Sequence, residues 1–190
     1  IDTRGKFGIY GTYVIEDGEY LFTLQNVINK KFRIEKGGSI TWNGDPFDAD
    51  IDLTAVYKIR TSLYNLYDAE NPNIINPDTS NKRVPVDCII HMTNKLFNPE
   101  ITFDIDFPTL NDLSREEYKA VVRPNINYQF ISLLAINTFV ATSTGNTTGG
   151  TQSTTGNKLA GTSGAEFLSN QLSNWLSQIS SDFDIGLNYR

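Results

Sequence analysis

The chain has 190 residues, enough for one domain with a sizeable core, and carries 22 acidic against 16 basic residues for a formal net charge of −6. No cluster of lysine or arginine could follow a phosphate backbone, which excludes nucleic acid as the expected partner. The sequence has a single cysteine, which can form no internal disulfide, and no apolar run of about 18 residues or more that could cross a membrane.

Segments in which every second residue is apolar dominate the first 107 residues. Because successive side chains of a strand point to opposite faces, these segments predict strands with one apolar and one polar face. Glycine- and aspartate-rich stretches at 16–18 and 36–38 predict tight hairpins, so residues 1–107 are expected to form an antiparallel meander in which strands adjacent in sequence are adjacent in the sheet.

The clearest strands are expected over 50–60, 84–93 and 101–107. Cys88 lies in an alternating run of apolar residues and is expected to point with them. A stretch over 67–83, rich in Asn, Pro and Asp, has no period and is expected to be a long loop.

After Pro108 the apolar period becomes helical, so residues 108–141 form a predicted helical segment. Leu113, Tyr118 and Val121 or Val122 predict a first helix behind a start at Ser114, and Pro124 ends it. A second helix over about 126–140 is apolar on most sides, so we expect it to be buried against the sheet.

The last third of the chain changes composition twice. Residues 142–162 are rich in Thr, Gly, Ser and Asn and predict a flexible linker. Residues 163–181 begin with the capping-box pair Ser163 and Glu166 and predict an amphipathic helix whose polar face lacks basic residues, which favours a lid or packing helix on protein over a membrane-surface helix. Its apolar stripe is Leu168, Leu172, Trp175, Leu176 and Ile179. Alternation returns over 183–190, so the chain is expected to be a fragment of a longer one.

No set of residues predicts catalysis, a metal site or a cofactor. His91 lies on the polar phase of its strand without a suitable partner and is expected to be a surface residue. Asp48, Asp50 and Asp52 have the opening spacing of a calcium loop, but Leu53 stands where such a loop needs glycine and no glutamate closes it, so a solvated polar face is favoured.

Aromatic side chains recur along the strands and could form either a core or a sugar-stacking platform. Alternation assigns many of them to the apolar face, which favours the core. These residues are Tyr13, Tyr20, Phe22, Phe32, Trp42, Phe103 and Phe107.

The apolar face predicted by this alternation must be covered, because each large side chain gains about 1.5–3 kcal/mol on burial. A second sheet, the predicted helices or a bound acyl chain could cover it. We expect a mostly β fold: a curved, taco- or gutter-like antiparallel sheet with an apolar concave face and two or three helices in the C-terminal third. The residues expected to line a lipid groove on that face are Ile34, Ile40, Trp42, Ile51, Leu53, Ala55, Ile101, Phe103 and Ile105.

Several short motifs, taken in order, resemble the conserved C-terminal domain of the TamB family. They are Gly11–Tyr13, Gly18–Phe22, Asn29–Ile34, Gly37–Pro46, Ala49–Ala55, Pro99–Phe103, Pro108, Leu113–Ser114, Glu166–Trp175 and Phe183–Ile185. The resemblance covers nearly the whole chain and implies that 1–190 is one such domain.

The resemblance implies a non-enzymatic role in the periplasm of Gram-negative bacteria, in a parent protein anchored in the inner membrane outside this sequence. The family resembles AsmA-like, bridge-type lipid-transfer proteins, whose groove is thought to carry phospholipid acyl chains toward the outer membrane. The implied partner is TamA, an outer-membrane barrel of the Omp85 type, with a link to insertion of outer-membrane proteins. Contact with the barrel is expected from strands beyond Arg190.

Two other functions remain open on the sequence. An exposed sheet edge could act as a scaffold that holds strands of nascent outer-membrane barrels without binding lipid. Alternatively, two apolar-faced sheets could pack together as a secreted β-sandwich binding module.

Overall fold

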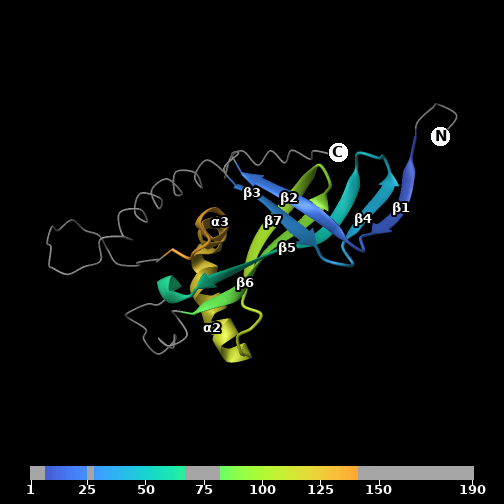
Figure 1. Cartoon of the computed structure of the whole chain (residues 1–190). Helices are drawn as coiled ribbons and strands as arrows, with labels where there is room; N and C mark the ends of the chain where they lie inside the picture. Colours follow the sequence, from blue (N-terminus) through green and yellow to red (C-terminus); the bar gives the residue numbers. More distant parts are fainter. Residues whose placement is uncertain (1–6, 25–27, 67–81, 141–190) are drawn as a thin grey trace, which may run out of the picture.

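The computed structural model describes residues 7–24, 28–66 and 82–140. These residues form a mostly β fold, a single open, curled antiparallel sheet of seven strands with helices at one end (Figure 1). The strands are β1 (Ile9–Val14), β2 (Gly18–Leu24), β3 (Ile28–Ile34), β4 (Ser39–Gly44), β5 (Ala49–Ser62), β6 (Arg83–Lys95) and β7 (Asn98–Asp106). The helices are α2 (Asp112–Val122) and α3 (Ile126–Ile136), with short 3₁₀ turns η1 (Tyr64–Leu66) and η2 (Arg123–Asn125). The expected linker over 142–162, helix over 163–181 and strand over 183–190 lie outside the described residues, as does most of the expected loop.

The long strands β5 and β6 are the backbone of the sheet. They pair without a break from Asp50 opposite Lys95 to Ser62 opposite Arg83, and β7 continues the ladder on the other edge of β6. The sequence-based prediction of these strands is confirmed, and each begins one to three residues earlier than predicted. Cys88 is completely buried with its apolar neighbours, as alternation predicted.

The predicted meander is wrong in its pairing. β1 pairs with β4 and β2 with β3, so these strands form one long hairpin with a bend in the middle. The two turn-like stretches lie opposite each other at that bend: the Ile15 N–H donates to the Gly38 carbonyl at 2.7 Å, and the Gly37 N–H donates to the Ile15 carbonyl at 2.9 Å. Gly37 has φ +98°, a conformation that favours glycine, and this backbone freedom serves the bend instead of a hairpin tip.

The bend sends the two halves of the hairpin to different stretches of β5. β4 pairs with β5 over Ala49–Asp52, whereas β3 touches it only where Ile34 faces Ala55 and Arg33 faces Val56. Beyond that point β2 and β3 leave the sheet and pass over its apolar face toward α3 (Figure 1). The sheet is therefore curled around the helices.

The first helix begins earlier than predicted, because Asn111 is its N-cap and its Oδ1 accepts a hydrogen bond from the Ser114 N–H at 2.9 Å. Leu113 is 73% exposed, so its predicted place on the apolar stripe is wrong. Leu113 and Tyr118 are five positions apart, which separates them by about 140° around a helix. Tyr118 and Val122, four positions apart, are the buried pair.

The second predicted helix is confirmed as a buried element. The first helix, α2, ends at Val122, just before the 3₁₀ turn η2 that contains Pro124, and α3 follows directly after η2. Gln129, Phe130 and Leu133 are among its buried residues. The Gln129 side chain is satisfied by the chain that follows the helix, since its Nε2 donates to the Val140 carbonyl at 2.7 Å and its Oε1 accepts from the Val140 N–H at 3.0 Å.

Candidate functional site

The residues predicted to line a groove share one face of the sheet. In an antiparallel ladder, directly opposite residues point to the same side. The register sets Ile40 opposite Ile51 and Trp42 opposite Ala49 on one stretch of β5. Further along, Ala55 faces both Ile34 and Ile90, and the remaining partners are Leu53 with Met92, Met92 with Ile101, Ile90 with Phe103 and Cys88 with Ile105. Their common face is thus a structural fact, whereas a role in lipid binding stays a prediction.

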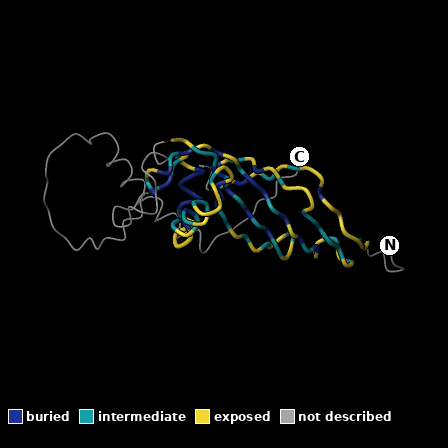
Figure 2. The backbone as a smooth tube through the Cα atoms, turned by 90° about the horizontal axis from the view of Figure 1, so that it is seen from below, coloured by how far each residue is buried: buried dark blue, intermediate teal, exposed yellow. Residues whose placement is uncertain are grey.

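Burial along this face is uneven. Ala55 and Ile105 are completely buried, and Ile51 and Leu53 are nearly so. The other members are half-buried: Ile34, Ile40, Trp42, Ile101 and Phe103. In Figure 2, exposed segments of the described residues predominate toward the N-terminal end, and buried segments gather at the other end of the sheet. The face therefore has a closed end and an open end.

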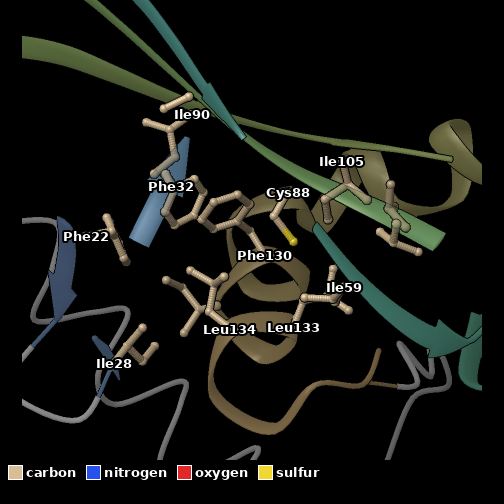
Figure 3. Packing of buried hydrophobic residues seen from close by; sticks show 14 of the residues in the cluster. Phe22, Ile28, Phe32, Ile59, Cys88, Ile90, Ile105, Phe130, Leu133 and Leu134 are labelled. Carbon is tan, nitrogen blue, oxygen red and sulfur yellow. The ribbon is translucent and has the colours of Figure 1, made fainter. Parts of the chain in front are cut away.

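Aromatic rings from α3 fill the closed end. Phe130 stacks on Phe103 of β7 with ring centroids 4.3 Å apart and on Phe32 of β3 at 6.1 Å, and it meets Phe22 of β2 edge-on at 6.4 Å. Figure 3 shows Phe130, Leu133 and Leu134 pointing from α3 into the apolar cluster of the strands. Of the covers considered for the apolar face, the protein's own helix is thus the one present at this end.

Ion pairs hold α2 to the end of β7. Arg115 Nε donates to Asp106 Oδ1 at 2.6 Å, and Lys119 Nζ lies 3.2 Å from Asp104 Oδ2 and 3.7 Å from Asp106 Oδ1. Burial raises the pKa of the Asp106 carboxyl, but hydrogen bonds from Arg115 and the Phe107 N–H, with the charge of Lys119, outweigh it and leave this pKa below its usual range. The carboxylate is therefore held in its charged form.

The open end lies on β1 and β4, where Ile40 and Trp42 are half-buried, although Ala49 and Ile51 opposite them on β5 are buried. Tyr13, opposite Ile40, is 60% exposed, so its expected place in a closed core is wrong, whereas Phe22, Phe32 and Phe107 are buried as expected. The Trp42 indole N–H donates to the Pro46 carbonyl at 3.2 Å, which satisfies its only polar atom. Its ring is then free to act as an apolar surface.

A cleft of about 700 Å³ lies at the fork where β3 leaves β5. Its lining is largely charged: Lys31, Arg33, Lys36 and Lys58 with Glu16, Asp17 and Glu35, beside Ile34, Val56 and Tyr57. Several of these charges are paired, with Lys31 Nζ 3.2 Å from Glu19 Oε2 and Arg33 Nη2 3.2 Å from Asp17 Oδ1. This cleft is lined mostly by charged side chains and shares Ile34 with the predicted apolar groove.

The weaker sequence candidates have ordinary partners. Lys95 Nζ lies 2.8 Å from both Asp48 Oδ1 and Asp50 Oδ1, and these bonds raise the pKa of Lys95. A lysine therefore takes the oxygens that a calcium ion would use. No group of His, Cys, Asp or Glu within the described ranges could hold a metal ion. His91 is half-buried on the polar face, with Nδ1 3.1 Å from Thr54 Oγ1.

Sequence reasoning missed Phe130, the residue that closes one end of the face. The signal present was a helix apolar on most sides, which predicts burial. It did not reveal which strands the helix would meet. The contacts of Phe130 with Phe22 and Phe32 depend on the bent hairpin, and its contact with Phe103 depends on the packing of α3 against β7.

An open curled sheet with one apolar face, closed at one end by a helix, defines a class of β-groove domain. The family model for the TamB C-terminal domain matches residues 1–190, so the chain belongs to the TamB family. Neither the comparison with curated proteins nor that with solved structures gives a match.

Family membership links the chain to the translocation and assembly module and to outer-membrane assembly in the envelope of Gram-negative bacteria. The family is a non-enzymatic one. Among the described helices, none has the length and apolarity that crossing a membrane requires.

Proposed function

We propose that this chain is a non-enzymatic segment of a periplasmic lipid conduit and that phospholipid acyl chains occupy the open end of its apolar face. The observation that carries the proposal is that several apolar side chains on this face stay half-buried, represented by Ile40 and Trp42 on β4 and Ile101 on β7. The closed end, filled by Phe130, would then be where the conduit ends within this domain.

Energetics support an apolar occupant for the open end. Full burial of a large apolar side chain gains about 1.5–3 kcal/mol relative to exposure, so half-buried side chains of this kind leave a substantial part of that free energy unrealised. An acyl chain has no polar groups to satisfy and can lie against these side chains. A polar ligand would leave its hydrogen bonds unmade there.

The cellular setting of the proposal follows the family. We place the domain in the periplasm, in a parent protein anchored in the inner membrane, with a TamA-like barrel of the Omp85 type as the partner at the outer membrane. In this setting the conduit would serve phospholipid transport, outer-membrane protein assembly or both.

The experiment is mass spectrometry of lipids extracted from the protein after purification from a Gram-negative envelope, using a matched pair of variants on β7. Ile101→Asp places a charge on the apolar face, and Thr102→Asp places the same charge on the exposed opposite face. We expect phospholipid in the parent and in Thr102→Asp but several-fold less in Ile101→Asp, with all three folded by circular dichroism. Equal lipid in both variants would contradict the proposal.

Positions deeper on the face are poor choices for this test. Phe103 is stacked on Phe130. Leu53 is packed tightly against Gly38, since a Cβ added to Gly38 would lie 2.9 Å from Leu53 Cδ2. A charge at either position would break the core. Loss of lipid could then reflect loss of the fold.

A second candidate, the β-edge scaffold, has one specific observation in its favour. Within the described residues β1 pairs only with β4 and β7 only with β6, so each leaves one edge without a strand partner. A stable, folded and lipid-free parent in the same experiment would favour this function. The sandwich alternative loses support, because all seven described strands belong to one sheet.

A further inference from the structure

Two exposed phenylalanines lie in turns at the end of the sheet that is farthest from the helices. Phe47, in the turn between β4 and β5, is 75% exposed, and Phe97, in the turn between β6 and β7, is 57% exposed. Their ring centroids are 5.9 Å apart, so they form one apolar point, here called the aromatic tip. Neither ring takes part in the core that α3 completes.

Backbone hydrogen bonds hold the tip in place. In the first turn, the Phe47 N–H donates to Asp45 Oδ1 at 2.9 Å and the Asp48 N–H donates to the Asp45 carbonyl at 3.1 Å. The Leu96 N–H donates to the Ala49 carbonyl at 2.8 Å and ties the second turn to the first. The rings are thus presented by an ordered framework, which lowers the entropy that binding would cost.

The size of the tip favours a lipid surface over a protein partner. A fully buried phenylalanine covers about 150–250 Å², so two rings offer far less than the roughly 800 Å² that each side of a stable protein interface buries. Phenylalanine side chains on protruding turns can instead enter the boundary between headgroups and acyl chains, as the Trp, Phe and Leu residues of interfacial helices do.

The charges around the tip specify the kind of lipid. Asp45, Asp48, Asp50 and Glu100 lie in or beside the two turns, and Lys95 is the basic residue among them. Lys95 is already held between Asp48 and Asp50. The surroundings are therefore acidic, which repels anionic headgroups and accepts the ammonium groups of zwitterionic ones.

We propose that the aromatic tip is a membrane-contact element that inserts Phe47 and Phe97 into the interface of a zwitterionic bilayer. The Trp42 indole bonds to Pro46 in the same turn as Phe47, so the contact lies at the open end of the apolar face. The inference stands apart from the lipid-conduit function, since the tip can touch a bilayer whether or not the face carries lipid.

Flotation of the full chain with vesicles tests this inference. One set of vesicles contains phosphatidylcholine and phosphatidylethanolamine, and the other also contains phosphatidylglycerol. The test variant is Phe47→Ser with Phe97→Ser, and the matched control is Tyr64→Ser with Leu113→Ser, which removes two exposed apolar side chains near the helices, 51% and 73% exposed. All proteins are first compared by thermal unfolding.

We expect the parent and the control to float with the zwitterionic vesicles and the tip variant to bind about tenfold more weakly. Phosphatidylglycerol should weaken binding of the parent, and added salt should relieve that loss. The inference is overturned if the parent does not float, if the control loses as much binding as the tip variant, or if binding requires phosphatidylglycerol.

Discussion

At the scale of single residues, Phe130 carries the closed end of the apolar face. It is completely buried and contacts rings from β2, β3 and β7. Phe130→Ala should therefore lower the free energy of unfolding by about 3–5 kcal/mol, measured by urea denaturation. Leu113→Ala, on the exposed face of α2, should change it by no more than about 0.5 kcal/mol. Similar losses in both variants would show that α3 does not close the face as described.

The bend in the long hairpin depends on the absence of a side chain at Gly38. A Cβ there would lie 2.9 Å from Leu53 Cδ2 and 3.4 Å from the Asp52 carbonyl oxygen. We expect Gly38→Ala to destabilise the fold by about 1–3 kcal/mol, as overpacking does. In a Leu53→Val background the extra cost of Gly38→Ala should fall clearly, since the δ-carbons of Leu53 are gone. If denaturant unfolding shows the same cost of Gly38→Ala in both backgrounds, the destabilisation does not come from contact with Leu53.

At the scale of elements, α2 is attached to β7 by the Asp106 and Arg115 pair, and this attachment depends on pH. Since the folded-state pKa of Asp106 lies below its unfolded value, the pair contributes stability above about pH 4 and loses it as the pH falls through the folded pKa. Asp106→Asn should be less stable than the parent at pH 7, and the difference should shrink below about pH 4.

Denaturant unfolding over this pH range measures the effect of the pair. Glu19→Gln is a suitable control, because it removes one carboxylate from an exposed pair whose side chains are 71% and 67% accessible. A stability difference for Asp106→Asn that is independent of pH would argue that packing, and not charge, holds α2 in place.

The sequence predicted the positions of the long strands but not the pairing of the first four. β5, β6 and β7 were predictable because alternation is local and each strand has one apolar face. The pairing of β1 with β4 was not, since glycine and aspartate serve a bend such as that at Gly37 as well as a hairpin turn. The predicted burial of Leu113 was wrong for a different reason. The N-cap at Asn111 and the position of each residue around the helix axis decide which side of α2 is buried.

At the scale of the whole molecule, alternation was enough to place the predicted groove residues on one face. It could not predict that α3 closes part of that face, because this depends on contacts between Phe130 and three distant strands. The aromatic tip was equally hidden, since Phe47 and Phe97 lie in separate turns that only the sheet brings together. Local periodicity predicts faces, whereas long-range packing decides which parts of a face stay open.

Site-specific photocrosslinking in a Gram-negative envelope tests the central claim most directly. A photoreactive phenylalanine analogue replaces Trp42 or Ile101 at the open end, Thr102 on the opposite face, or Phe130 at the closed end. After irradiation, mass spectrometry of the purified protein measures phospholipid adducts. We predict adducts from positions 42 and 101 and none above background from 102 and 130. Equal adducts from both faces, or none from 42 and 101 in a folded protein, would contradict a lipid-binding open end.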